Sequence, residues 1–206
     1  PPARGRLVVQ TYVSRIRGAL ATLGGDSSGV TLERAPSGYL LTVERDAVDA
    51  HRFRHLVEAA RASADPRERS KLVDEALQLW RGPPIADASE PLRAHLCARL
   101  EELRQYAVEM RIESELALGR HSELIGELTE LVAQFPLSER LIGFDMLARA
   151  RSGRRHDALK LYRQARLRLA EELGLDPSDQ LQRLHQAVLR GDTGLPGGGA
   201  ASPHHP

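Results

Sequence analysis

A short stretch near the start of the chain combines side chains that can contact nucleic acid. Residues 8–20 read VVQTYVSRIRGAL and contain Arg15 and Arg17 but no acidic residue. Arginine can donate two hydrogen bonds to a guanine edge, glutamine can bond adenine in the same way, and Ser or Thr can reach bases or phosphates. These residue types, without a carboxylate to repel phosphate, are suited to a nucleic-acid surface.

The apolar residues of this stretch predict which side of a helix would be buried. Val9, Val13, Ile16, Leu20 and Leu23 recur at steps of three and four, which is typical of one helical stripe over residues 8–23. The outward side then holds Gln10, Thr11, Ser14, Arg15, Arg17 and Gly18. Two interpretations of that side stay open on the residues alone: a surface that binds DNA, or the solvated face of a basic helix in an arginine-rich protein.

The remaining reactive residue types form no catalytic or metal-binding pattern in the sequence. His51 and His55 are spaced four apart, but neither an HExxH motif nor a carboxylate set accompanies them, so we expect surface or half-buried histidines. Cys97 is the single cysteine, and we expect it to pack. The sequence contains neither a P-loop nor a GxGxxG motif. We therefore expect no enzyme, no metal site and no cofactor.

The elements after the first helix predict a hairpin. The run GGDSSG at 24–29 is a loop by composition, and Val30–Arg34 and Tyr39–Val43 have strand character on either side of Ala-Pro-Ser-Gly. A helix followed by a β-hairpin is the second half of a winged helix-turn-helix. Arg34, near the tip of the hairpin, could lie along a minor groove or the phosphate backbone.

From Asp46 onward the periodicity is helical. The predicted helices span about 47–62, 66–80, 91–118, 121–134, 137–151, 155–172 and 177–190. Asp65-Pro66 and Asp176-Pro177 each have the residue types of an N-cap and a first helical position. Gly119 and Gly153 lie 34 residues apart, each between two predicted helices, which is the tetratricopeptide period. The sequence thus predicts a stack of antiparallel helix pairs.

Composition supports a helical, non-membrane protein. Aromatic residues make up only 4% of the chain, so its core must be mostly aliphatic, and we expect Leu79, Trp80, Phe135, Phe144 and Tyr162 to belong to that core rather than to a ligand pocket. The single cysteine favours a reducing compartment, and no apolar run reaches the ~18 residues of a membrane span. We expect a cytoplasmic protein, a flexible tail or linker over 191–206, and a piece of a longer protein, since residue 1 is not Met.

The stretch VVQTYVSRIRGAL followed by LERAPSGYLL resembles the recognition helix and wing of the OmpR-like winged helix in the Streptomyces antibiotic regulatory protein (SARP) family. The later blocks VDAHRFRHLVEAARA, EALQLWRGPPIAD, RLEELRQYAVEMRIESELALGRHSELIGEL, FPLSERL and ALKLYRQARLRLAEELGLDPSDQLQRLHQAVL resemble the bacterial transcriptional activation domain of that family. The resemblance covers about residues 8–190. It implies a mainly α protein with part of a winged helix at 1–46, a tetratricopeptide-like helical domain at 47–190 and a tail at 191–206.

The resemblance also implies a function. Such proteins activate antibiotic and other secondary-metabolite genes: two protomers bind side by side on promoter direct repeats and contact RNA polymerase, including its sigma factor. The positions matching the family's DNA face are Gln10, Thr11, Ser14, Arg15 and Arg17 on the helix and Arg34 and Ser37 on the wing. We expect Thr11 and Arg15 to contact bases, and Arg17 and Arg34 to contact phosphates.

Two further expectations follow. The family's winged helix has a sheet and two helices before the recognition helix, and these do not lie within the 206 residues. The apolar stripe of residues 8–23 should therefore lack packing partners. For the same reason, this chain alone should bind DNA poorly. The alternative function is a helical sensor module that binds a protein or an effector within a larger signalling regulator.

Overall fold

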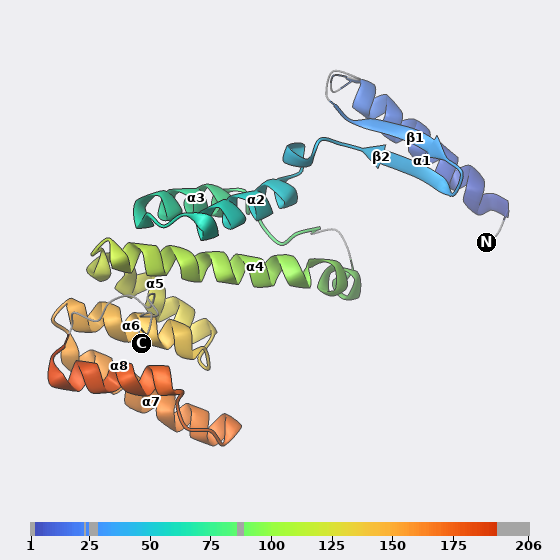
Figure 1. Cartoon of the computed structure of the whole chain (residues 1–206). Coiled ribbons are helices and arrows are strands. Elements are labelled where there is room, and N and C mark those ends of the chain that lie inside the picture. The colour runs from blue at the N-terminus through green and yellow to red at the C-terminus, as the bar shows by residue number, and fades with distance from the viewer. Residues whose placement is uncertain (1–2, 23, 25–28, 86–88, 193–206) are drawn as a thin grey trace, which may run out of the picture. The chain divides into compact units, whose positions relative to one another are not determined.

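The computed structural model describes residues 3–22, 24, 29–85 and 89–192, which divide into compact units at 1–55 and 56–206 (Figure 1). The first unit holds α1 (Ala3–Thr22), β1 (Thr31–Ala35), β2 (Gly38–Thr42) and the 3-10 helix η2 (Arg45–Ala47), and α2 (Asp49–Ala62) crosses into the second unit. The second unit continues with α3 (Pro66–Gln78), α4 (Glu90–Ala117), α5 (His121–Gln134), α6 (Glu139–Arg151), α7 (Arg155–Leu173) and α8 (Asp179–Arg190). The prediction of a mainly α protein with a winged-helix-like start is confirmed.

The hairpin of the first unit is a two-stranded antiparallel sheet. Its register pairs Thr31 with Thr42 at one end and Ala35 with Gly38 at the other, so Pro36 and Ser37 form the turn. Each strand lies one residue closer to the turn than the sequence predicted, because the two-residue connection lets the ladder continue to Ala35 and Gly38.

One arginine joins α1 to this hairpin. Arg17 donates from Nε and Nη2 to the carbonyl oxygen of Leu32, at 2.9 and 2.7 Å, and its Cζ lies 6.0 Å from the centroid of the Tyr39 ring. Val13, one turn earlier on the same face of α1, is buried. These contacts define the side of α1 that faces the hairpin. Arg17, predicted from the sequence to lie on the outward side, therefore uses part of its guanidinium within the protein.

The second unit is organised around α6. This helix packs against α5, α7, α8 and α4, and its buried residues belong to one core cluster with those of its neighbours. The buried apolar residues of α6 are Leu141, Ile142, Met146, Ala148 and Ala150. They cover most of its circumference, as expected for a helix enclosed by others rather than lying at a surface.

The two predicted glycine turns have matching structures. Gly119 and Gly153 follow α4 and α6 with φ of +83° and +77°, in the left-handed region where glycine is favoured. In both turns the backbone N–H of the residue after the glycine donates a hydrogen bond to the carbonyl oxygen five residues earlier. Arg120 donates to Glu115 at 3.1 Å, and Arg154 donates to Arg149 at 2.8 Å. This is the Schellman arrangement, and its recurrence after 34 residues agrees with the predicted helix-pair repeat.

Two sequence-based expectations need correction. Asp65 caps α3 as predicted, accepting from the Arg67 N–H at 3.1 Å, but Asp176 does not cap α8. The α8 cap is Ser178, whose Oγ accepts from the Leu181 N–H at 3.4 Å, so the helix begins after the predicted Asp-Pro pair. Phe135, predicted in the core, lies exposed at the C-terminal cap of α5, where the chain leaves the helix.

A buried ion pair lies within the helical core. Asp145 of α6 is 1% exposed and accepts from Arg149 Nε and Nη2 at 2.8 and 3.0 Å, and Arg149 Nη2 also donates to Thr129 Oγ1 of α5 at 2.8 Å. Burial raises the pKa of the Asp145 carboxyl, and the Arg149 guanidinium opposes that rise. The pair satisfies a carboxylate that water cannot reach and links α6 to α5.

We expect Arg149→Ala to lower the free energy of unfolding by about 3–5 kcal/mol, since it leaves a buried carboxylate without its cation. Without the guanidinium that opposes the effect of burial, the pKa of Asp145 in the folded variant should lie above that in the folded unmodified chain. The deficit should therefore be full above the pKa of the folded variant and should shrink as the pH falls and the carboxyl becomes protonated in both folded chains. Urea unfolding followed by circular dichroism at several pH values measures it. The double variant Asp145→Asn/Arg149→Met, which removes both charges, should cost less; equal stability of Arg149→Ala and the unmodified chain would contradict the role assigned to the pair.

We expect Arg17→Ala to loosen the hairpin, because it removes two charged hydrogen bonds to Leu32 and the contact with Tyr39. A loss of about 1 kcal/mol would speed amide exchange in the β1–β2 ladder by about fivefold. Hydrogen–deuterium exchange followed by NMR measures this rate. Arg15→Ala, which removes an exposed arginine of the same helix that does not bond the hairpin, is the matched control, and unchanged exchange in Arg17→Ala would rule out the tether.

Candidate nucleic-acid interface

The side chains of α1 fall on three sides of the helix. Val13 and Arg17 face the hairpin, as described above. An apolar side carries Tyr12, Val9 and Ile16, which are 59%, 49% and 48% exposed. The third side is polar. Most of the apolar stripe predicted from the sequence is therefore uncovered among the described residues, and only Val13 is buried.

The polar side of α1 consists of exposed residues that the sequence assigned to DNA contact: Gln10, Thr11, Ser14 and Arg15. Thr11 and Arg15 are spaced four apart and thus lie one turn from each other on the same face. Thr11 Oγ1 donates to the Leu7 carbonyl at 2.9 Å, so its hydroxyl proton is used and its lone pairs remain available to accept from a base amino group. Arg15 forms no hydrogen bond or ion pair with any described residue, so its five N–H donors are available.

The hairpin adds the two predicted wing residues. Arg34 on β1 and Ser37 in the turn are both exposed. Arg34 is paired across the ladder with Tyr39, the residue whose ring lies under the Arg17 guanidinium. Glu33 is exposed beside Arg34, but neighbouring residues of a strand point to opposite faces, so its carboxylate lies on the other face of the hairpin.

Tyr39 is the residue of this site that sequence reasoning missed. It connects the two cationic positions, since it is the ladder partner of Arg34 and the ring beneath Arg17. Its only signal in the sequence is an aromatic residue at the start of the second strand, which is equally typical of ordinary strand packing.

The other residues considered from the sequence form no site in the part of the chain that the structure describes. His51 and His55 are exposed, and no group of three or more metal-ligating side chains occurs among the described residues. Cys97 is buried, with Sγ 3.9 Å from the Pro84 carbonyl oxygen. Tyr162 stacks on His185 with centroids 3.8 Å apart, inside the helix packing. Within the same ranges, no helix is long and apolar enough to cross a membrane.

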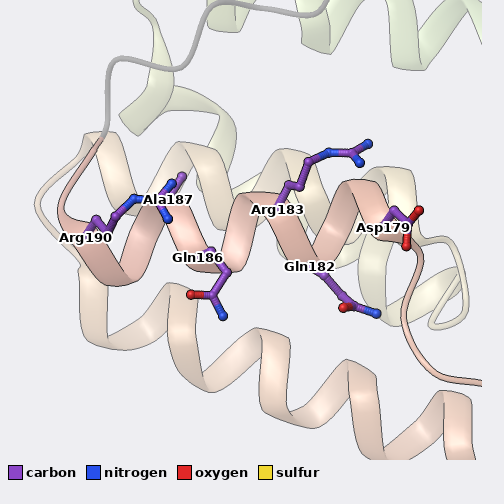
Figure 2. A pocket seen from close by; sticks show the side chains of 6 residues that line it. All are labelled: Asp179, Gln182, Arg183, Gln186, Ala187 and Arg190. Atoms are coloured by element: carbon purple, nitrogen blue, oxygen red, sulfur yellow. The ribbon is translucent and has the colours of Figure 1, made fainter.

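Two surface grooves on the helical unit are lined mainly by residues with charged or polar side chains. One lies along the outer side of α8 and is lined by five charged or polar residues and one alanine: Asp179, Gln182, Arg183, Gln186, Ala187 and Arg190 (Figure 2). Another, beside α3, is lined mainly by charged residues, among them Arg67, Asp74 and Arg120. Small-molecule pockets are concave and enclose most of the ligand among few polar groups, whereas both grooves are open and carry several charged side chains, so neither favours the sensor-module alternative.

Comparison with known proteins agrees with the resemblance read from the sequence. Residues 48–189 match the bacterial transcriptional activator domain family. The chain is 37% identical to the regulatory protein DnrI of Streptomyces peucetius over 98% of this chain and 78% of DnrI, and 39% identical to the regulatory protein AfsR of Streptomyces griseus over 95% of this chain. It spans only 20% of that AfsR.

A solved structure has the same fold. It is that of Mycobacterium tuberculosis EmbR in complex with a low-affinity phosphopeptide, with a TM-score of 0.80 and 34% sequence identity, covering 92% of this chain and 51% of the EmbR chain. The shared fold extends from α1 and its hairpin into the helical stack. On the matched domain and on the similarity along nearly the whole chain, this protein belongs to the SARP family of transcriptional regulators.

Proposed function

We propose that the chain binds promoter DNA through α1 and its hairpin and activates secondary-metabolite (antibiotic) biosynthesis genes. The observation that carries the proposal is the polar side of α1: it is exposed, it has cationic and hydrogen-bonding groups, and it lacks a carboxylate. An α-helix with such a side fits the major groove, where each base pair presents a distinct set of donors and acceptors.

The contacts divide into those that read bases and those that hold the backbone. Arg15 and Thr11 would read base edges, since both are exposed on the polar side of α1. Arg34 would hold a phosphate from the hairpin. Arg17 would also hold a phosphate. Its guanidinium has five N–H donors, and only two of them bond the Leu32 carbonyl oxygen. Gln10, Ser14 and Ser37 would complete the surface.

The rest of the proposal concerns assembly. We assign residues 1–46 to the DNA-binding part, 47–190 to the activation domain and 191–206 to a tail or linker; residues 193–206 lie outside the described residues. Two protomers would bind side by side on direct repeats, and the helical domain would contact RNA polymerase, including its sigma factor, in the cytoplasm. A helical sensor module in a larger regulator remains the second candidate, and neither polar groove favours it.

We expect Arg15→Ala to reduce sequence preference in the full-length protein. The bidentate contact of one arginine with guanine discriminates by about 1–3 kcal/mol, which is about 5- to 150-fold in affinity ratio. In vitro selection from random duplexes defines the preferred site, and fluorescence anisotropy then compares that site with single-base variants.

The companion variant Arg17→Ala should behave differently. It should weaken binding to all sequences by a similar factor and lower the slope of log affinity against log salt, because a phosphate contact releases counterions without reading sequence. If Arg15→Ala kept its selectivity while Arg17→Ala lost it, the two roles would be wrong.

We also expect the 206-residue chain on its own to bind its selected site at least tenfold more weakly than the full-length protein. The apolar side of α1, with Val9 and Ile16 about half exposed, needs a partner to fix the helix in its bound position. Gel-shift titration of both proteins, with circular dichroism of the short one, measures this, and equal affinities would contradict it.

A further inference from the structure

The helix α7 contains a second cationic stretch without acidic residues. Between Asp157 and Glu171, residues 158–170 read ALKLYRQARLRLA, with four cations and no carboxylate. The buried residues of α7 are Ala158, Tyr162, Ala165 and Leu169, and they pack it against α6 and α8. In Figure 1, α7 lies with α8 at the edge of the helix stack away from α4.

A leucine lies at the centre of the outward side of α7. Leu167 is 62% exposed. It is two residues from the buried Leu169, a turn of about 200° around the helix, so it points away from the core. Lys160 and Arg163, seven and four residues before it, lie on the same side, and both are exposed. We call Lys160, Arg163, Arg166, Leu167 and Arg168 the α7 outer surface.

Three of the four cations of this surface have no counter-charge within the described fold. Arg166 lies 3.9 Å from Asp176, a long contact between two largely exposed side chains. The other three, Lys160, Arg163 and Arg168, form no ion pair with a described residue. On α6, in contrast, Arg140 pairs with Glu109 of α4, and Arg149 pairs with Asp145 of α6 itself. Residues 193–206, which lie outside the described ranges, contain no Asp or Glu side chain to supply a counter-charge.

We propose that the α7 outer surface docks an acidic segment of RNA polymerase that inserts an apolar side chain against Leu167. This rests on the proposed activation function and assigns the polymerase contact to one helix face. An apolar centre with a charged rim is the usual anatomy of a protein–protein interface. A nucleic-acid backbone would need the cations alone, whereas a 62% exposed leucine gains from burial only against another apolar group.

The neighbouring helix α8 provides a matched control. Its outer groove also contains arginines, Arg183 and Arg190, but they alternate with Gln182 and Gln186, and no large apolar residue lines it (Figure 2). Arg183→Glu therefore repeats a charge reversal on an exposed residue of the same helix pair, outside the α7 outer surface.

The experiment compares the full-length protein with Arg163→Glu, Leu167→Asp and Arg183→Glu variants whose helix content matches by circular dichroism. Run-off transcription is measured with purified RNA polymerase holoenzyme on a promoter that carries the selected site, at saturating activator. Anisotropy measures affinity for that site and, without DNA, affinity for the holoenzyme. Arg163→Glu and Leu167→Asp should each lower activation and holoenzyme affinity at least tenfold, with DNA affinity changed less than twofold. Arg183→Glu should match the unmodified protein in all three.

The remaining outcomes overturn the inference in distinguishable ways. Unchanged holoenzyme affinity in both α7 variants, or no holoenzyme binding by the unmodified protein, excludes this surface as the contact. Loss of DNA affinity in these variants means that the surface holds DNA instead. Failure of the unmodified protein to bind any selected duplex contradicts the proposed function, while the holoenzyme measurement still tests the α7 outer surface separately.

Discussion

The enclosure of α6 is the constraint on which the helical unit depends. Four helices pack against α6, so apolar residues cover most of its circumference, and its buried Asp145 must have a partner within the protein. Arg149, one turn later on α6, supplies that partner and also bonds Thr129 of α5. The core is built mainly from aliphatic side chains and alanines, and glycines with positive φ end α4 and α6.

This constraint separates the parts of the molecule that pack from those that can bind. Because α6 occupies the centre, α7 and α8 each bury one side and leave the other in water. The outer groove of α8 is lined by charged and polar residues and Ala187, whereas the outward side of α7 combines cations with the exposed Leu167. In the first unit, Arg17 and the buried Val13 hold α1 to its hairpin, and most of its other described side chains are exposed. Both binding proposals thus concern helices whose inner side is fixed.

Local signals in the sequence were sufficient to find most elements. The predicted helix 121–134 coincides with α5, and 91–118 differs from α4 by one residue at each end. An aliphatic stripe bounded by glycine, as after α4, or by proline, as after α5, identifies a helix without knowledge of the rest of the fold. The start of α8 was misplaced because Asp176-Pro177 and Ser178 all have capping chemistry. A tertiary contact accompanies the observed start: the Ser178 N–H donates to Glu139 Oε2 at 2.6 Å.

The candidate site was predicted in part. Periodicity placed Thr11 and Arg15 on the outward side of α1, and both are exposed. The same reasoning could not show that Arg17 bonds Leu32, because that partner is 15 residues away and lies on another element. Periodicity does place Leu167 away from the buried stripe of α7, but it could not show that no neighbouring element of the described fold covers it. Residue types alone left open whether the polar side of α1 binds DNA or is only solvated. The family resemblance favoured DNA.

The central claim is that the polar side of α1 lies in the major groove and that Arg15 reads guanine there. Dimethyl sulfate methylates guanine N7 in the major groove and adenine N3 in the minor groove, so it distinguishes the two grooves at each base. The account predicts that the full-length protein protects one or more guanine N7 positions in its selected site, and that Arg15→Ala at saturating concentration loses protection at one of them. Protection confined to adenine N3, or an unchanged guanine pattern with Arg15→Ala, would contradict it.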